Sequence, residues 1–511
     1  MLFNSYLFLF IFLPLCLAGF YLLKEKQATL AKVWLTCFSL WFYGYFNIFY
    51  LLIMLGSICG NYLIHKEIIR SREKQKNNVD KLLLILGVSG NLLVLVYFKY
   101  YDFFVENINT LWNTGLTVRG ILLPLGISFF TFQQISFLAD TYRRELKKCN
   151  FVDYSLFVSF FPQLIAGPIV THEEMLPQFQ KIGKDDRSKK ELQDLFLQGI
   201  YVFTLGLAKK VLLADTFGRA VDYAYSNVAG VNGLESFLVI LFYSLQLYFD
   251  FSGYCDMAKG LAGLFGMSIS NNFNSPYQAI NIIDFWKRWH ITLSRFFTQN
   301  IYIPLGGNKR GRARTYGNLF FVFFLSGIWH GAGWNFILWG ILHGSLYVLT
   351  RIILDRKKER QQGNIKVSEM EKRIVCFTFK KWIGRIFTFF YVSFAWVYFR
   401  SDTVEQGNTL LKNLITKPWK LPPDNFLDFF NLGEFWYPMK VLGITKLPFA
   451  RTYLMIGFLF VSLGIVFFGR NVEQIKEKFT PTAMNACISG ILLVWCIISL
   501  SGVSTFLYFN F

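Results

Sequence analysis

Residues 318–349 read NLFFVFFLSGIWHGAGWNFILWGILHGSLYVL, an apolar run of bilayer length that contains two histidines. A helix of about 20 apolar residues is long enough to cross the hydrocarbon core of a bilayer. His330 lies in the middle of this run, where burying an ionisable side chain is costly and a functional role is the default hypothesis. The segment 331–333, Gly-Ala-Gly, interrupts the helical pattern directly after it. The run therefore predicts membrane insertion and places a titratable group beside a break in the helix.

The rest of the chain repeats this apolar character. Of its 511 residues, 54% are hydrophobic and 16% are charged, whereas soluble proteins have about 45–50% apolar and about 25% charged residues. The other predicted spans are 5–23, 33–50, 51–64, 81–98, 121–139, 151–170, 195–213, 235–265, 383–399, 452–469 and 484–506. No polar stretch is long enough to build a separate core. We therefore expect an all-α polytopic membrane protein in which residues 1–511 form a single domain.

The net charge of +20 comes from lysines and arginines in short loops between the apolar spans. Cytoplasmic loops of membrane proteins carry such an excess of basic residues, which also attract anionic lipid headgroups. No basic domain or base-reading motif accompanies the charge, so the expected partner is the lipid bilayer and not nucleic acid. With the basic loops in the cytoplasm, both termini are predicted to be extracytoplasmic. Residues 401–450 then form an extracytoplasmic loop, followed by C-terminal helices over 452–511.

Two stretches do not follow the pattern of simple crossings. Residues 161–168, Phe-Pro-Gln-Leu-Ile-Ala-Gly-Pro, contain two prolines, which break a helix, and basic loops flank 151–170 on both sides. We expect a hairpin that enters the membrane and returns, with its broken backbone satisfied by protein or water. Residues 270–315 are too charged to span and are expected to form cytoplasmic or half-inserted helices.

The segment 284–299 is interpreted as one amphipathic helix that contains His290. Its polar residues recur at helical spacing and form one stripe, made of Asp284, Arg288, Thr292, Arg295 and Gln299. The functional interpretation is a cationic funnel for an anionic cofactor, with His290 at its inner end. The alternative is an ordinary interfacial helix, because its aromatic residues suit a membrane surface.

The environment of His330 favours acid–base chemistry. Desolvation favours the neutral imidazole, which accepts a proton. Gly327, Gly331 and Gly333 leave room beside it for a ligand or for another backbone. The alternative is a histidine that only packs.

The remaining histidines are expected to have other roles. His343 lies 13 residues beyond His330, about 20 Å along an unbroken helix, so it is expected to pack or to line the other leaflet. His65, in a basic loop, and His172, in a polar turn, are expected to be solvated or structural.

Two aspartates fall inside the apolar span 235–265 and need partners there. Asp250 and Asp256 are available to pair with Arg288 or Arg295, or to orient a catalytic histidine. We favour structural pairing.

The sequence lacks the motifs of several other classes of enzyme. It has no G-x-S-x-G elbow of a serine hydrolase, no P-loop and no H-E-x-x-H. Its eight cysteines form no C-x-x-C pair and lie mostly in apolar runs, where cysteine packs as a small hydrophobic residue. We therefore expect no resident metal and no disulfide framework. Residues 4–23 lack the basic start and the cleavage site of a signal peptide and are expected to remain as a helix.

Seven motifs occur in an order that resembles a known family. They are Leu123-Pro-Leu-Gly-Ile-Ser-Phe-Phe-Thr-Phe132, Phe161-Pro-Gln-Leu-Ile-Ala-Gly-Pro168, Asp250-Phe-Ser-Gly-Tyr254, Asn272-Phe-Asn-Ser-Pro276, Asp284-Phe-Trp-Lys-Arg-Trp-His-Ile-Thr-Leu-Ser294, Tyr302-Ile-Pro-Leu-Gly-Gly307 and Trp329-His-Gly-Ala332. Each motif alone is weak, but their joint order is specific and covers nearly the whole chain. The chain resembles the membrane-bound O-acyltransferases, and within them the bacterial alginate and peptidoglycan O-acetyltransferases.

The resemblance implies a ring of about ten or eleven transmembrane helices, with re-entrant and cytoplasmic helices, around a central tunnel. It implies that His330 and His290 are the catalytic histidines. The donor is then acetyl-CoA or another acyl thioester, used as a substrate and not as a bound cofactor. The acyl group crosses the bacterial cytoplasmic membrane to an extracytoplasmic SGNH-hydrolase-like acetyltransferase, for O-acetylation of a cell-surface polysaccharide or peptidoglycan. The other residues expected to bind the donor or substrate are Lys287, Arg288, Arg295, Gln299, Trp329, Trp334, Asp250 and Asp256.

Two other functions stay open. Transfer of D-alanine from a carrier protein to teichoic acid belongs to a related branch, which tends to lack the long C-terminal part. A non-enzymatic transporter of an acyl donor or polymer would need paired inverted segments with broken helices, and the sequence shows no such pairing.

Overall fold

The structure is a computed structural model that describes residues 1–74, 77–146, 148–184, 187–362, 370–431, 433–444, 447–501 and 506–507. Every regular element within these ranges is a helix, which confirms the all-α class. The chain divides into two compact units. The first comprises Met1–Leu207, Gly253–Asn271 and Phe479–Phe511, and the second comprises Ala208–Ser252 and Asn272–Lys478.

Seven helical stretches within the described ranges are long and apolar enough to cross a membrane. They are Ile48–Glu73, Asn78–Trp112, Lys189–Ser226, Gly233–Leu264, Trp334–Lys357, Lys380–Arg400 and Ala450–Phe468, and two shorter apolar helices cover Phe8–Lys24 and Ala483–Ile498. Large apolar side chains on these helices, such as Leu22, Leu93 and Phe460, are about two-thirds or more exposed. A helix satisfies its own backbone hydrogen bonds, so it can present such side chains to lipid. The multi-pass membrane character expected from the sequence is confirmed.

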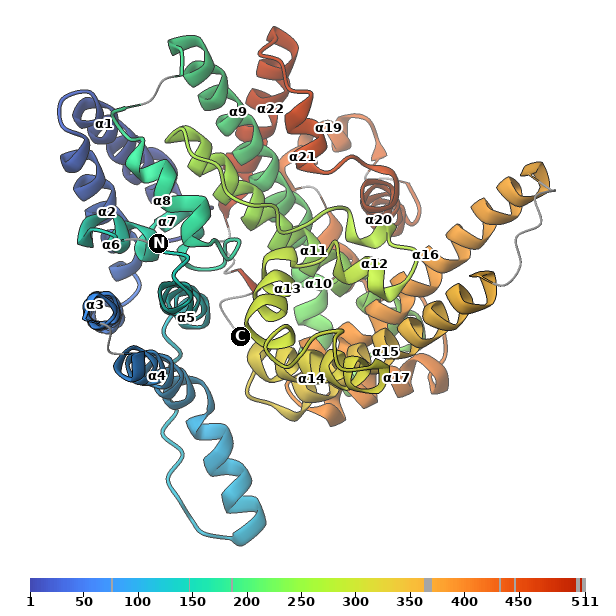
Figure 1. Cartoon of the computed structure of the whole chain (residues 1–511). Coiled ribbons are helices and arrows are strands. Elements are labelled where there is room, and N and C mark those ends of the chain that lie inside the picture. Colours follow the sequence, from blue (N-terminus) through green and yellow to red (C-terminus); the bar gives the residue numbers. More distant parts are fainter. Residues whose placement is uncertain are drawn as a thin grey trace. The chain divides into compact units, whose positions relative to one another are not determined.

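The first unit packs its N-terminal helices around a cluster of phenylalanines. Its elements are η1 (Phe8–Phe12), α1 (Leu13–Lys24), α2 (Ala28–Gly44), α3 (Ile48–Glu73), α4 (Asn77–Trp112), α5 (Ile127–Arg143), α6 (Phe151–Ser159), α7 (Phe161–Leu164), α8 (His172–Gln180), α9 (Lys189–Ala208), α22 (Ala483–Ile498) and η9 (Ser499–Ser501) (Figure 1). Phe12 meets Phe161 edge-on, with their ring centroids 5.3 Å apart. Trp34 lies so close to α1 that a Cβ added at Gly19 would fall 2.2 Å from the indole ring. Glycine at this position therefore allows the close approach of α1 and α2.

The proline-containing hairpin is broken where the sequence predicts. α6 ends at Ser159, and α7 carries Pro162 in its first turn. Proline has no amide hydrogen with which to continue α6. The amide of Phe161, at the break, donates a hydrogen bond to Ser39 Oγ of α2 at 3.2 Å. A side chain from another helix thus satisfies a backbone group that the break sets free.

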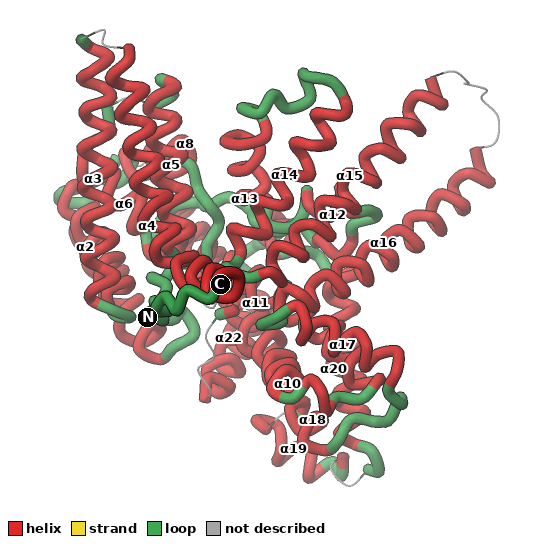
Figure 2. Tube along the Cα trace, turned by 90° about the horizontal axis from the view of Figure 1, so that it is seen from below, coloured by secondary structure: helices red, strands yellow, loops and turns green. Residues whose placement is uncertain are grey.

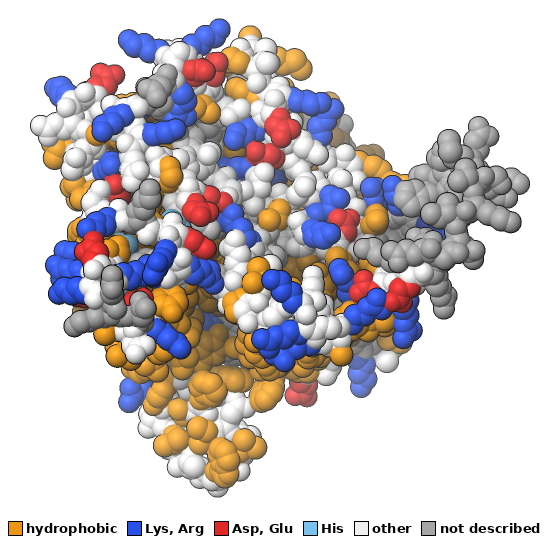
Figure 3. Space-filling model, viewed as in Figure 1, with side chains coloured by type: hydrophobic (Ala, Val, Ile, Leu, Met, Phe, Trp, Pro, Cys, Tyr) orange, Lys and Arg blue, Asp and Glu red, His pale blue; other side chains and the backbone are white. Residues whose placement is uncertain are grey.

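The end of α4 presents a hydrophobic surface. Leu111 and Trp112 are 71% and 69% exposed, and Leu122 in the following loop is 76% exposed. Figure 3 shows orange side chains over this projecting end of the helix and its loop. Exposed apolar patches of this kind mark membrane or protein contacts.

The second unit contains the first part of α11 (Gly233–Leu264), whose most apolar stretch is 89% buried, the highest share among the seven candidate spans. The elements before and around the histidines are η2 (Lys209–Ala214), α10 (Asp215–Ser226), η3 (Val228–Gly230), η4 (Pro276–Gln278), α12 (Ile282–Trp286), α13 (Ile291–Phe297), η5 (Thr298–Tyr302), α14 (Arg312–His330), α15 (Trp334–Gln362) and α16 (Met370–Arg400). They are followed by α17 (Val404–Thr416), α18 (Asp424–Leu427), η6 (Asp428–Phe430), η7 (Gly433–Phe435), α19 (Trp436–Val441), α20 (Ala450–Phe468) and α21 (Val472–Glu477). The segment 401–450, which the sequence predicts to connect two membrane spans, contains the short helices α17, α18, η6, η7 and α19.

α14 and α15 form an antiparallel hairpin and lie side by side in both views (Figures 1 and 2). The turn falls at 331–333, as predicted. A Cβ added at Gly327 would lie 2.5 Å from the backbone oxygen of Phe336, and one added at Gly340 would lie 2.6 Å from that of Phe323. These two glycines therefore let the two backbones touch, as small residues do between membrane helices.

Candidate active site

The segment 284–299 is not one helix, and the single polar stripe predicted for it was wrong. α12 ends at Trp286, and α13 begins at Ile291. His290 between them has a φ of 47° and a ψ of 52°, in the left-handed region. A non-glycine residue in this region costs energy and persists only where its surroundings hold it.

The surroundings that hold His290 come from the segment 272–274. Ile291 N donates to the backbone oxygen of Asn272 at 3.0 Å, and Asn274 N donates to the oxygen of Arg288 at 2.9 Å. The backbone groups that the helix break leaves without helical partners therefore find partners in this segment. The sequence predicts only a turn over 271–276 and does not predict that this turn contacts His290. The residue that could have indicated the contact is Asn272, whose polar side chain lies between Asn271 and Phe273.

The side chain of Asn272 also contacts the His290 ring. Its Oδ1 lies 3.1 Å from His290 Nδ1. The same oxygen accepts hydrogen bonds from Thr292 N at 3.2 Å and from Thr292 Oγ1 at 2.9 Å. Phe251 of α11 meets the imidazole edge-on, with a centroid distance of 4.9 Å. The orientation of His290 is thus fixed on more than one side.

His290 and His330 lie in the same unit with their ring centroids 6.5 Å apart. Trp329 lies near both rings, at 4.7 Å from His330 and 6.1 Å from His290. His290 is fully buried, and His330 is 4% exposed. Two imidazoles at this separation do not form a hydrogen bond with each other directly.

Aromatic rings cover the other sides of His330. Trp339 of α15 and Phe399 of α16 lie 5.0 and 5.1 Å from its ring. The space expected at Gly327 is occupied by α15, and a Cβ at Gly331 would meet the ring of Phe336 at 2.1 Å. The surroundings of His330 are therefore apolar and close-packed on these sides.

His343 lies much closer to His330 than an unbroken helix would place it. Because the hairpin reverses the chain, Trp339 contacts both rings, at 5.0 Å from His330 and 4.8 Å from His343. Trp286 Nε1 donates to His343 Nδ1 at 3.3 Å, so the neutral His343 ring carries its proton on Nε2. The predicted distance of about 20 Å between His330 and His343 assumed a continuous helix and is wrong, because the helix breaks between them.

Burial determines the protonation state of His290, which lies outside the candidate spans. Loss of solvent disfavours the charged imidazolium and lowers the pKa of His290 to about 3. The ring is therefore neutral at physiological pH and has one accepting nitrogen. A neutral imidazole is the form needed to accept a proton or a hydrogen bond.

The structure brings only some of the predicted binding residues to the histidines. Trp329 contacts both rings, whereas Trp334 is 60% exposed at the start of α15. Arg288 pairs with Asp284 at 2.8 Å. The remaining predicted residues of this region are exposed or half-buried, and they are Lys287, Arg295 and Gln299.

The two aspartates of α11 have separate surroundings. Asp250 pairs with Lys210 at 2.6 Å, and Lys210 also pairs with Asp215 at 2.8 Å. The expected structural pairing of Asp250 is confirmed, but its partner is neither of the arginines that we considered. Asp256 belongs to the first unit. The sequence analysis overlooked Lys210, which lies within the predicted apolar span 195–213. A buried lysine requires an acidic partner, so Lys210 could have been identified as the partner of Asp250.

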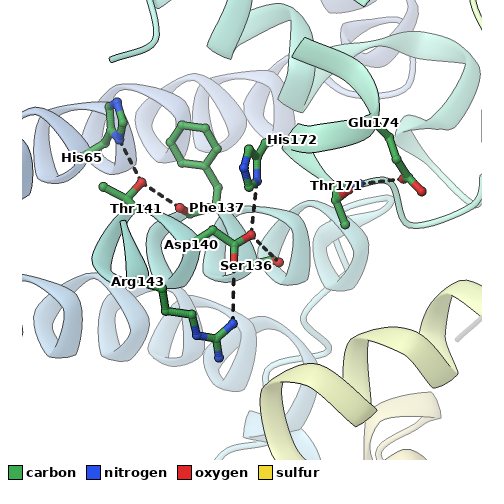
Figure 4. A network of polar contacts seen from close by, with 9 residues as sticks. All are labelled: His65, Ser136, Phe137, Asp140, Thr141, Arg143, Thr171, His172 and Glu174. Atoms are coloured by element: carbon green, nitrogen blue, oxygen red, sulfur yellow. Dashed lines mark hydrogen bonds and ion pairs between the residues drawn. The ribbon is translucent and has the colours of Figure 1, made fainter. Parts of the chain in front are cut away.

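His65 and His172 lie in a buried polar network of the first unit (Figure 4). His65 is part of α3 and is fully buried, so its assignment to a basic loop was wrong. Its Nδ1 lies 2.9 Å from Thr141 Oγ1. His172 Nδ1 faces Asp140 Oδ2 at 3.2 Å. These contacts join α3 and α8 to α5, which is a structural role.

The long apolar helices define an integral membrane protein, and its second unit holds two buried histidines next to breaks in its helices. Residues 40–356 match the membrane-bound O-acyltransferase (MBOAT) family, and the chain belongs to that family. It is similar to a peptidoglycan O-acetyltransferase of Helicobacter pylori, with 40% identity over 442 residues that cover 81% of this chain and 80% of the relative. It is also similar to a probable alginate O-acetylase of Pseudomonas putida, with 32% identity over 538 residues and full coverage of both. A teichoic acid D-alanyltransferase of Streptococcus thermophilus is 29% identical over 263 residues, which cover 48% of this chain and 62% of the relative. The chain is thus an O-acyltransferase.

Proposed function

We propose that this protein moves an acetyl group from a cytoplasmic thioester across the membrane, for O-acetylation of a cell-surface polysaccharide or peptidoglycan. The observation that carries the proposal is the buried pair His290 and His330, 6.5 Å apart between ring centroids, in a member of the MBOAT family. Both O-acetyltransferase relatives align over about four-fifths or more of the chain. The donor is acetyl-CoA or another acyl thioester, which binds as a substrate.

His330 acts as the general base. It takes the proton of an acceptor hydroxyl while the hydroxyl oxygen attacks the thioester carbonyl, and the carbon–sulfur bond breaks to release the thiol. His290 orients the substrate next to this carbonyl. The close aromatic packing around His330 excludes water, which would otherwise compete with the acceptor and hydrolyse the thioester.

Basic residues of the second unit attract the anionic donor. Lys287, Lys309 and Arg310 are exposed, and Arg295 is half-buried. Clustered charge of one sign raises the local concentration of an oppositely charged substrate. Gln299, Trp329 and Trp334 complete the donor path, and the salt bridge of Asp250 with Lys210 holds α11 in place beside it.

The wider architecture proposed is a single membrane domain in which about ten or eleven helices surround a tunnel through the bacterial cytoplasmic membrane. Both termini are extracytoplasmic, as is the segment 401–450. On that side an SGNH-hydrolase-like acetyltransferase receives the acetyl group and places it on the polymer.

Mass spectrometry of cell-surface polymers tests the proposal by comparing the wild type with a deletion strain. Loss of O-acetyl groups supports it. Loss of D-alanyl esters instead would favour the D-alanyl branch, whose similarity covers 48% of the chain. Loss of the whole exported polymer would favour a transporter and would contradict acetyl transfer.

A further inference from the structure

The contacts of Asn272 determine which nitrogen of His290 is available to a substrate. We propose that Asn272 is a positioning residue that keeps the proton of His290 on Nδ1 and thereby presents Nε2 as a hydrogen-bond acceptor. The inference rests on the proposed function, because it assigns a role to a side chain of the same site.

The identity of the Asn272 atom that faces His290 follows from Thr292. The amide of Thr292 can only donate, and it lies 3.2 Å from the same carboxamide atom that faces the imidazole. That atom is therefore the oxygen. An oxygen at 3.1 Å from Nδ1 requires a proton on Nδ1, so the second nitrogen of the neutral ring carries the lone pair.

The carboxamide is itself held in place. Thr292 Oγ1 lies 2.9 Å from Oδ1, and the backbone of Asn272 accepts from Ile291 N at 3.0 Å. The left-handed backbone at His290 and the edge-on contact with Phe251 limit the orientation of the imidazole. A rotated Asn272 would turn its amide nitrogen toward the imidazole and toward the amide of Thr292, which cannot accept a hydrogen bond, and it would favour the opposite tautomer.

This arrangement restricts the chemistry of His290. A neutral ring with its lone pair on Nε2 accepts a hydrogen bond from a substrate O–H or N–H, and it cannot donate one to a developing oxyanion. Stabilisation of an oxyanion therefore falls to other donors. His343 has the opposite tautomer, because its Nδ1 accepts from Trp286, so the two histidines are not interchangeable.

The substitution Asn272→Asp tests the proposal through the pH profile. The carboxylate accepts the same hydrogen bonds from Thr292, but its negative charge stabilises the imidazolium and so protonates Nε2 at higher pH. We expect kcat of the variant to be about 10–100-fold below that of the wild type at pH 6 and to recover as the pH is raised. In the wild type, kcat should show no decrease at pH 6 caused by protonation of His290. The assay follows label from radiolabelled acetyl-CoA into base-labile esters of added envelope polymer, using membrane vesicles.

A purely structural role of Asn272 would lower kcat by the same factor at every pH, and that result would overturn the proposal. If Asn272→Asp does not accumulate in the membrane, Thr292→Val and Thr292→Ser are compared instead. The valine removes the Oγ1 contact while the serine keeps a hydroxyl, so we expect reduced kcat only in the valine variant. Equal kcat in these two variants would contradict the inference.

The His330→Ala variant separates failure of the inference from failure of the proposed function. Full incorporation of label by that variant, or none by the wild type, would reject the proposed function itself. An inactive His330→Ala variant together with parallel pH profiles for the wild type and Asn272→Asp would reject only the role of Asn272.

Discussion

The substitution Gly327→Ala should displace His330 without changing any reactive group. The new Cβ would lie 2.5 Å from the backbone oxygen of Phe336 and 3.1 Å from Cα of Gly340. A carbon–oxygen contact needs about 3.3 Å, so α14 and α15 must separate locally by roughly 0.8 Å (about 3.3 Å less 2.5 Å). The oxygen belongs to a helix backbone and cannot rotate away as a side chain would.

The expected cost has two parts. Overpacking of this kind lowers the free energy of unfolding by about 1–3 kcal/mol. Because His330 is the last residue of α14, it moves with the helix, and a displacement approaching 1 Å lowers activity by about 10²-fold. We therefore expect a lower thermal midpoint in detergent and a tenfold to hundredfold loss of acetyl transfer, about the order that this displacement implies.

Gly317→Ala is the matched control on the same helix. A Cβ at Gly317 meets nothing within 4 Å, and alanine favours a helix over glycine by about 1 kcal/mol. This control should keep its activity, and its thermal midpoint should not fall. If Gly327→Ala behaved like Gly317→Ala in both measurements, close packing of the hairpin would not be what positions His330.

Three further perturbations have defined outcomes. Lys210→Met leaves the buried Asp250 and the half-buried Asp215 without their shared cation and should lower the free energy of unfolding by about 3–5 kcal/mol. The control Arg70→Ala should leave thermal unfolding almost unchanged, because the ion pair of Arg70 with Glu67 is largely exposed. Ser39→Ala removes the acceptor of the Phe161 amide at the hairpin break and should cost about 1–3 kcal/mol, whereas Thr36→Val removes a hydroxyl that bonds within its own helix and should cost less. Burial lowers the pKa of His290 from 6.5 to about 3, so the unfolded chain binds a proton more readily than the folded chain does. The free energy of unfolding therefore decreases as the pH is lowered below about 6.5, by about 2 kcal/mol at pH 5. A variant His290→Gln should lack this part of the pH dependence, and an unchanged slope of thermal midpoint against pH would contradict the assignment.

Much of the fold follows from the sequence because a bilayer imposes long apolar helices with few alternatives. The break before Pro162 and the turn at 331–333 were also predictable, since proline and glycine act locally. The direction of the chain after 333 was not predictable from periodicity. The hairpin depends on the pairing of Gly327 with Gly340, which becomes visible only when the two helices are placed together.

The candidate site was predictable in its residue types and not in its geometry. His290 and His330 were identified from an ionisable group in an apolar run and from the family resemblance. A helical repeat predicted one continuous helix over 284–299, but backbone contacts from the segment 272–274 replace helical hydrogen bonds at His290 and stabilise its left-handed conformation. Lys210 was missed for a related reason, because its pairing with Asp250 joins residues 40 positions apart.

The most direct test of the central claim measures O-acetyl groups on cell-surface polymers after complementation of a deletion strain. The wild-type gene and the His330→Ala variant are compared at equal amounts of protein in the membrane. We predict that the wild type restores O-acetylation and that His330→Ala does not. Full restoration by His330→Ala would contradict the assignment of His330 as the general base.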